Sequence, residues 1–213
     1  ATCPLVTKVH VGARAYAKRG YTILLVGHRD HVEVEGVVGE APENTIVVEN
    51  AMEASLVQVP DETKVALLTQ TTLSVDEARA VTCVLERRFP ELVQQQSEDI
   101  CYATQNRQDA VKRMAPELDL LLVIGDPTSS NSNRLRELGE SRQIPSYLIL
   151  GPEEIQPEWL EGKRAIGLSS GASTPEVSVQ GVLAKLGSLG ASEVARIEGP
   201  GEEMVFALPQ ELK

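Results

Sequence analysis

The chain has 213 residues, and its 20 lysines and arginines against 31 aspartates and glutamates give a formal net charge of −11. A composition of 42% hydrophobic and 24% charged residues is that of a folded protein and excludes a collagen-like or broadly disordered chain. No apolar run approaches the ~20 residues that cross a bilayer, so we expect no membrane span. The acidic balance, with only one Trp, four Tyr and two Phe, argues against a nucleic-acid partner.

The order of apolar and amphipathic segments predicts alternating helices and strands. In chain order we expect a helix from Pro4 to Gly20, strands at 22–26, 45–48 and 64–68, a helix from Ser74 to Phe89, a helix at 105–114, a strand at 118–124, a helix at 133–140, strands at 146–150 and 164–168, a helix at 175–186, and final strands at 191–197 and 204–208. Most of the strands are apolar on both faces, which is typical of parallel strands buried between helices.

This alternation predicts an α/β protein with two small parallel-sheet domains. Two four-stranded units joined near residues 94–97 would match the length. We therefore expect one domain at 1–97, a second at 98–189, and a C-terminal strand segment at 190–213.

Three expected strands are followed at once by hydroxyl or amide residues and then a helix, at 69–74, 128–133 and 169–174. Ligands of parallel α/β sheets bind beyond the carboxyl ends of the strands, and helix N-termini there suit anions such as phosphate. The alternative is that these residues only cap helices. The run 129–133 (SSNSN) is denser than one cap requires.

Two further features are chemically suggestive and individually ambiguous. His31 and Glu33 lie in a polar segment after a strand and would share one side if that segment were extended, which offers an acid/base pair or, less specifically, a solvated loop. Cys3 and Cys101 each precede an expected helix, where a thiol can act as ligand or nucleophile, whereas Cys83 lies within a helix and is interpreted as a core thiol. Three scattered cysteines and no visible signal peptide favour a reducing compartment.

Six segments together carry a resemblance: ATCPLV (1–6), HVEVEG (31–36), TQTTLSVD (69–76), DICYATQNRQ (99–108), SSNSNRL (129–135) and GASTPE (171–176). In this order they resemble the hydroxymethylbutenyl diphosphate reductase family, the iron–sulfur enzymes that end the non-mevalonate isoprenoid pathway. The resemblance extends from residue 1 to about residue 208. It implies the second and third domains of a three-domain, trefoil-like arrangement around a [4Fe-4S] cluster.

The resemblance also implies roles for particular residues. Cys3 and Cys101 match two of the family's three ligand cysteines, Glu33 would help deliver a proton, and Thr71 would hold the substrate hydroxyl. The residues implied to bind the substrate's diphosphate are His31, Ser129, Ser130, Asn131 and Ser173. Electrons would come from ferredoxin or flavodoxin, and the compartment would be a bacterial cytoplasm or, alternatively, a plastid stroma.

One departure from the family is large. No segment of this sequence matches the family's N-terminal domain, which carries the first ligand cysteine and two substrate-binding histidines. We therefore expect a weak, labile cluster or none on these 213 residues. Besides the reductase, two alternative functions therefore remain. One is a non-catalytic diphosphate-binding module, and the other, more remote, is an unrelated phosphosugar-binding α/β protein.

Overall fold

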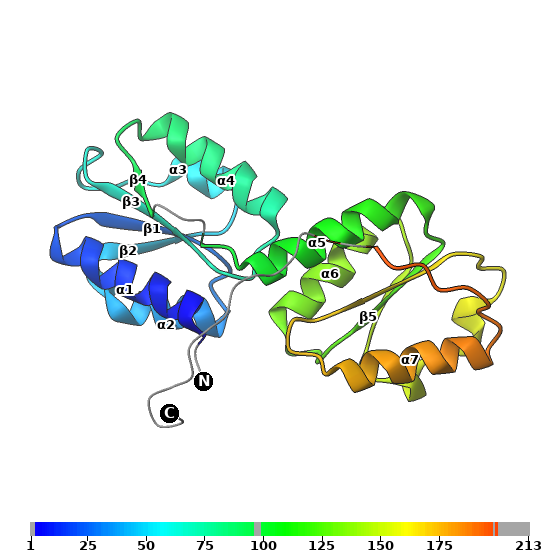
Figure 1. The fold of residues 1–213 in the computed structure, drawn as a ribbon. Coiled ribbons are helices and arrows are strands. Elements are labelled where there is room, and N and C mark those ends of the chain that lie inside the picture. The colour runs from blue at the N-terminus through cyan, green and yellow to red at the C-terminus, as the bar shows by residue number, and fades with distance from the viewer. Residues whose placement is uncertain (1–2, 96–98, 198, 200–213) are drawn as a thin grey trace, which may run out of the picture. The chain divides into compact units, whose positions relative to one another are not determined.

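The structure is a computed structural model that describes residues 3–95, 99–197 and 199 (Figure 1). The polypeptide divides between Cys101 and Tyr102 into two units, each built around its own sheet. The domain boundary expected at residues 97 and 98 falls outside the described residues. The predicted α/β class is confirmed, because both sheets are formed by parallel strand pairs.

The first unit is a four-stranded parallel sheet with helices on both faces. Its elements are α1 (Pro4–Lys18), β1 (Thr22–Val26), α2 (Val32–Glu40), a 3-10 turn (Pro42–Asn44), β2 (Thr45–Val48), α3 (Ala51–Leu56), β3 (Val65–Thr69), α4 (Val75–Arg88) and β4 (Val93–Gln94). The strand order is β2-β1-β3-β4. Helices α1 and α2 cover one face, and α3 and α4 cover the other (Figure 1).

The apolar residues of β1 explain this layering, because successive side chains of a strand point to opposite faces. Ile23 and Leu25 pack into the core beneath α1 and α2, whereas Leu24 and Val26 pack into the core beneath α3 and α4. All four are 0–1% exposed. The double-sided burial predicted from the apolar run is therefore confirmed in β1.

The second unit has a three-stranded parallel sheet in the order β6-β5-β7. Its elements are α5 (Tyr102–Met114), a 3-10 turn (Ala115–Glu117), β5 (Leu120–Ile124), α6 (Ser130–Glu140), β6 (Ser146–Ile149), 3-10 turns (Pro152–Glu154 and Pro157–Leu160), β7 (Ile166–Ser170) and α7 (Glu176–Ser188). Within this unit, α5 and α6 pack on one face of the sheet and α7 on the other (Figure 1).

Several sequence predictions are wrong in detail. The segment after β1 is not extended: Val32–Glu40 is helix α2, and α3 was also not predicted. The second sheet has three described strands where four were expected. Among the described residues, 191–197 form no strand. The strand expected at 204–208 falls outside the described residues.

Candidate functional site

In each unit, most of the candidate residues follow the carboxyl ends of parallel strands, where α/β sheets bind ligands. His31 and Glu33 follow β1, Thr71 follows β3, Cys101 follows β4, and in the second unit Ser129, Ser130 and Asn131 follow β5 and Ser173 follows β7. Cys3 differs, because it immediately precedes α1. Since β1 connects to β2 on one side and β2 then connects back to β3 on the other, the order of the first sheet reverses between β1 and β3.

Glu33 and Thr71 meet across this reversal point. The Thr71 N–H donates to Glu33 Oε1 over 2.6 Å, and the Thr71 hydroxyl lies 3.2 Å from Glu33 Oε2. Thr71 is buried, and Glu33 lies in the first turn of α2. Two residues that are 38 positions apart in the sequence are thus joined by two contacts to one carboxyl group.

The surroundings of Glu33 raise the pKa of its carboxyl group above the ordinary value of a glutamate. Burial raises the pKa of Glu33, and the negative charge of Asp99 raises it further. The two Thr71 hydrogen bonds and the positive charge of His10 lower this pKa, but burial is the larger effect. A carboxyl group of this kind can act as a general acid at a higher pH than an exposed glutamate can.

The same threonine is connected to Cys101. The Cys101 N–H donates to the Thr71 carbonyl oxygen over 2.9 Å. Asp99, two residues earlier, accepts a hydrogen bond from the Thr69 N–H over 3.1 Å and pairs with Lys8 Nζ at 3.1 Å. The segment that carries Cys101 is therefore fixed to the end of β3 at two points and to α1 at a third.

The two candidate ligand cysteines are free thiols at helix starts. Cys3 is the exposed N-cap residue of α1, and the half-buried Cys101 immediately precedes α5. The cysteine thiolate is the form that ligates iron. Cys83 lies in α4 and is half-buried rather than fully buried.

Iron–sulfur clusters are usually held by four thiolates, so these two cysteines fit such a cluster in chemistry but not in number. Within the part of the chain that the structure describes, no group of three or more His, Cys, Asp or Glu side chains is arranged to hold a metal ion.

His31 is held in one tautomer if its imidazole is neutral. Its Nδ1 accepts the Glu33 N–H over 3.2 Å and so caps α2. A neutral imidazole that accepts at Nδ1 carries its proton on Nε2, which makes Nε2–H a donor suited to an anionic ligand. Capping and ligand binding are thus compatible at this residue.

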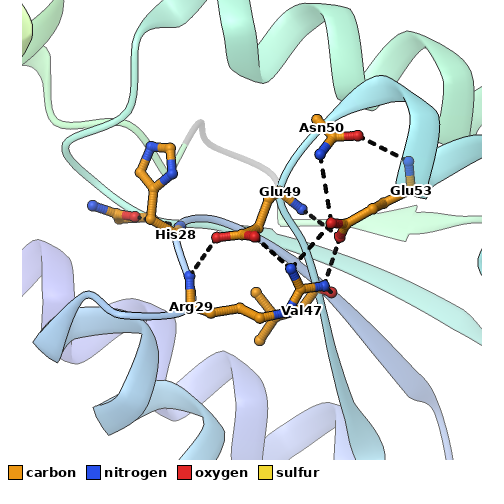
Figure 2. Close-up of polar contacts among 7 residues, drawn as sticks. His28, Arg29, Val47, Glu49, Asn50 and Glu53 are labelled. Atoms are coloured by element: carbon orange, nitrogen blue, oxygen red, sulfur yellow. Dashed lines mark hydrogen bonds and ion pairs between the residues drawn. The ribbon is translucent and has the colours of Figure 1, made fainter.

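The segment between β1 and α2 is clamped by Arg29. Figure 2 shows its guanidinium between the carboxylates of Glu49 and Glu53. Its Nη2 contacts Glu53 Oε2 at 2.6 Å and donates to the Val47 carbonyl oxygen over 3.0 Å. The neighbouring His28 N–H donates to the buried amide oxygen of Gln70, which fixes this segment to the end of β3 as well.

In the second unit, Ser129 caps α6 as the capping alternative predicted. Its hydroxyl oxygen accepts from the Ser132 N–H over 3.3 Å and from the Ser132 hydroxyl over 3.0 Å. The Ser132 hydroxyl fits against two glycines: a Cβ on Gly125 or Gly171 would lie 2.1 or 2.3 Å from its Oγ. These glycines let the ends of β5 and β7 approach the first turn of α6.

Asn131 is the most informative residue of this helix start. It is 7% exposed, and among the described residues neither of its side-chain polar atoms has a hydrogen-bond partner. A buried amide without partners costs roughly 1–3 kcal/mol, and an anion bound at this helix N-terminus would give the Asn131 Nδ2–H groups a partner. Ser130 is half-buried beside it in α6, whereas Ser173 is exposed in the turn between β7 and α7.

Sequence reasoning missed three supporting residues. Lys8 and Asp99 are 91 positions apart, and no spacing rule links them. Gln70 is 1% exposed and joins His28 to Thr72 through its two amide atoms. A polar residue directly after an apolar strand was the available signal for Gln70, but the signal did not distinguish it from a solvated loop residue.

Comparison with known proteins shows the family to which the chain belongs. The family model described as LytB protein matches residues 1–187. Relatives named 4-hydroxy-3-methylbut-2-enyl diphosphate reductase include those of Ralstonia nicotianae (47% identical over 213 residues, 66% of its length), Bordetella pertussis (50% over 212 residues, 65%) and Aromatoleum aromaticum (48% over 213 residues, 68%). Each alignment covers the whole of this chain, which spans about two thirds of the relatives' length.

A solved structure gives the same result for the fold. The E-1-hydroxy-2-methyl-but-2-enyl-4-diphosphate reductase of Plasmodium falciparum superposes with a TM-score of 0.81 at 38% identity, over 86% of this chain and 57% of that one. The chain is thus an α/β protein of the class to which these oxidoreductases belong. More particularly, it belongs to the LytB family. No helix in residues 3–95, 99–197 and 199 is both long and apolar enough to span a membrane.

Proposed function

We propose that this chain forms the substrate-binding and two-cysteine part of a 4-hydroxy-3-methylbut-2-enyl diphosphate reductase. The reaction replaces the hydroxyl of (E)-4-hydroxy-3-methylbut-2-enyl diphosphate by hydrogen, using two electrons and two protons, and releases water with isopentenyl and dimethylallyl diphosphate. The observation that carries the proposal is the series of hydrogen bonds from Glu33 through Thr71 to Cys101. It joins a carboxyl group with a raised pKa, a hydroxyl group and a thiol-bearing residue within one unit.

Cys3 and Cys101 are proposed as two of the ligands of a [4Fe-4S] cluster. The cluster would supply the two electrons, with ferredoxin or flavodoxin as their source. Neither thiol is in a disulfide, which supports their proposed role as ligands. A reducing compartment such as the bacterial cytoplasm would keep them available.

Glu33 and Thr71 are proposed as the proton-handling pair. In the structure the Thr71 hydroxyl donates to Glu33 Oε2. When Glu33 is protonated this hydrogen bond would reverse, so that Oε2 donates to the Thr71 hydroxyl and that hydroxyl donates to the leaving hydroxyl of the substrate. The Thr71 N–H then stabilises the carboxylate that remains after proton transfer, because it already lies 2.6 Å from Oε1.

The diphosphate ligands are proposed separately for each unit. In the second unit, the start of α6 supplies the positive end of its helix dipole and the unpaired side-chain amide of Asn131, with hydroxyl groups from Ser129, Ser130 and Ser173. In the first unit, His31 supplies Nε2–H. Neutral donors of this kind bind an anion in a chain of net charge −11 because distant charges are screened over roughly 10 Å.

A non-catalytic diphosphate-binding module remains the second candidate, favoured by one observation. The described residues contain no group of three potential metal ligands. Anaerobic reconstitution with iron and sulfide separates the two candidates, because iron–sulfur clusters absorb at about 410 nm.

The test uses a polypeptide of the relatives' full length, made by joining this chain to the third of the Ralstonia nicotianae relative that it does not match. The reductase proposal predicts an absorbance band that is lost in Cys101→Ser and retained in the control Cys83→Ser. The binding-module candidate predicts pyrophosphate binding by calorimetry with no such band in any variant. On this chain alone we expect little or no iron, and a stable four-iron cluster on it would contradict that expectation.

A further inference from the structure

Glu33 lies on the same face of α2 as the two residues of that helix that contact His10 of α1. Glu33, Gly36 and Glu40 follow one another at spacings of three and four residues and therefore share a helical face. His10 of α1 contacts the last two. Its Nδ1 lies 2.9 Å from Glu40 Oε1, and a Cβ on Gly36 would lie 3.2 Å from its Cε1.

The carboxylate that holds His10 also pairs with an arginine on the same helix as His10. Arg14, one turn further along α1, contacts the other oxygen of the same carboxylate, with its Nη1 2.7 Å from Glu40 Oε2. The hydrogen bonds from His10 and Arg14 lower the pKa of Glu40. Glu40 therefore stays an acceptor, and the His10 Nδ1 must carry a hydrogen.

The groups that act on Glu33 come from three directions. Thr71 donates two hydrogen bonds, Asp99 contributes a negative charge that is itself paired with Lys8, and His10 contributes a positive charge. The last of these opposes the effect of burial on the pKa of Glu33. Replacement of His10 by a neutral side chain would therefore raise the pKa of Glu33.

We infer that His10 is a positioning residue for Glu33: held by Glu40 and packed against Gly36, it fixes α2 against α1 and places its imidazole on the face of α2 that carries Glu33. The importance of His10 for catalysis rests on the proposed function, in which Glu33 is the proton donor. The contact of His10 with α2 does not depend on that function. Arg14 provides a matched control, because it binds the other oxygen of the same Glu40 carboxylate from one turn further along α1.

The test is a carbon-13 NMR titration of this chain labelled at the glutamate side-chain carboxyl carbons, without iron or substrate, with the Glu33 signal assigned through Glu33→Gln. His10→Gln keeps a donor for Glu40 but removes the charge, so the Glu33 midpoint is expected to move to higher pH. Arg14→Gln is expected to leave it in place, and His10→Arg, which restores the charge, is expected to return it toward the wild-type value.

An unchanged Glu33 midpoint in His10→Gln, or an equal shift in Arg14→Gln, would overturn the inference. His10→Asn is the second neutral variant should the glutamine protein not fold. Because the titration needs neither a cluster nor turnover, a failure of the proposed reductase function would leave its result intact. The two ideas therefore fail separately.

Discussion

Gly171 lies where the second unit has little room for a side chain. A Cβ there would lie 2.3 Å from the Ser132 Oγ, 3.3 Å from the Thr174 Oγ1 and 3.6 Å from the Ser132 Cβ. Gly171→Ala must therefore turn the Ser132 hydroxyl away from Ser129, which breaks a 3.0 Å hydrogen bond worth about 1 kcal/mol. With the residual crowding of a packed core, we expect a loss of about 1–2 kcal/mol in the free energy of unfolding.

The geometry also predicts which second substitution rescues the first. Ser132→Ala removes the atom at 2.3 Å, so Gly171→Ala in that background should cost less than about 0.5 kcal/mol. Gly125→Ala is the matched control. A Cβ at Gly125 would lie 2.7 Å from the Ser132 Cβ itself, so removal of the hydroxyl cannot relieve it.

The assay is urea unfolding followed by tryptophan fluorescence. Trp159 is the single tryptophan of the chain, lies in the second unit, and stacks on Tyr147 with ring centroids 3.9 Å apart. Its signal therefore reports on the unit that contains the substitutions. Equal costs of Gly171→Ala with and without the Ser132 hydroxyl would refute the reasoning.

Three further predictions concern buried polar groups. Because burial raises the pKa of Glu33, the native state is expected to lose stability as pH rises through that pKa, by at most about 1.4 kcal/mol per pH unit. Urea unfolding followed by circular dichroism should show a flatter dependence of stability on pH for Glu33→Gln. Identical pH profiles for the two proteins would contradict this prediction. Asn131→Leu removes two unpaired polar atoms, so it should raise the free energy of unfolding by about 1 kcal/mol. The same substitution should weaken pyrophosphate binding about tenfold or more. An unchanged affinity in calorimetry would show that Asn131 is not part of the anion site. Lys8→Met leaves the 7%-exposed side chain of Asp99 without its cation and should lower the free energy of unfolding in urea by about 1–3 kcal/mol. This is less than for a fully buried pair, because 27% of the Lys8 side chain is exposed. An unchanged free energy of unfolding would show that the pair does not hold α1 in place.

The strands were predictable because their physical signal is local. The run Thr22–Val26 is apolar on both faces, and the observed β1 has the same bounds. The start of α4 was predicted equally well, since Ser74 was expected to cap it and its hydroxyl oxygen accepts from the Glu77 N–H. Such features depend on only a few neighbouring residues, so they can be predicted without knowledge of the tertiary structure.

Helix α2 was not predictable on the same grounds. Its first residues, VEVE, alternate apolar and acidic side chains in the two-residue period of a strand, and its cap is His31 rather than one of the usual capping residues. Tertiary packing decides the outcome, because Val34 and Val37 share a helical face and are buried in the core with α1. The opposite error was made at 191–197, where an apolar pattern is not matched by a strand.

Some features of the candidate site could likewise be predicted from the sequence, and others could not. Residue types near strand ends indicated Glu33, Thr71 and the serine-rich start of α6, since they follow from topology. The pairing of Glu33 with Thr71 and of Lys8 with Asp99 joins positions far apart in sequence, so only the folded chain reveals it.

The most direct test of the proton-donating role of Glu33 is product formation by the reconstituted full-length polypeptide described above. Reduced anaerobically and given (E)-4-hydroxy-3-methylbut-2-enyl diphosphate, it should release isopentenyl and dimethylallyl diphosphate. Glu33→Gln should keep its iron content and its substrate binding while turnover falls about 100-fold or more. Turnover by Glu33→Gln at the rate of the unsubstituted polypeptide would contradict the role of that carboxyl group.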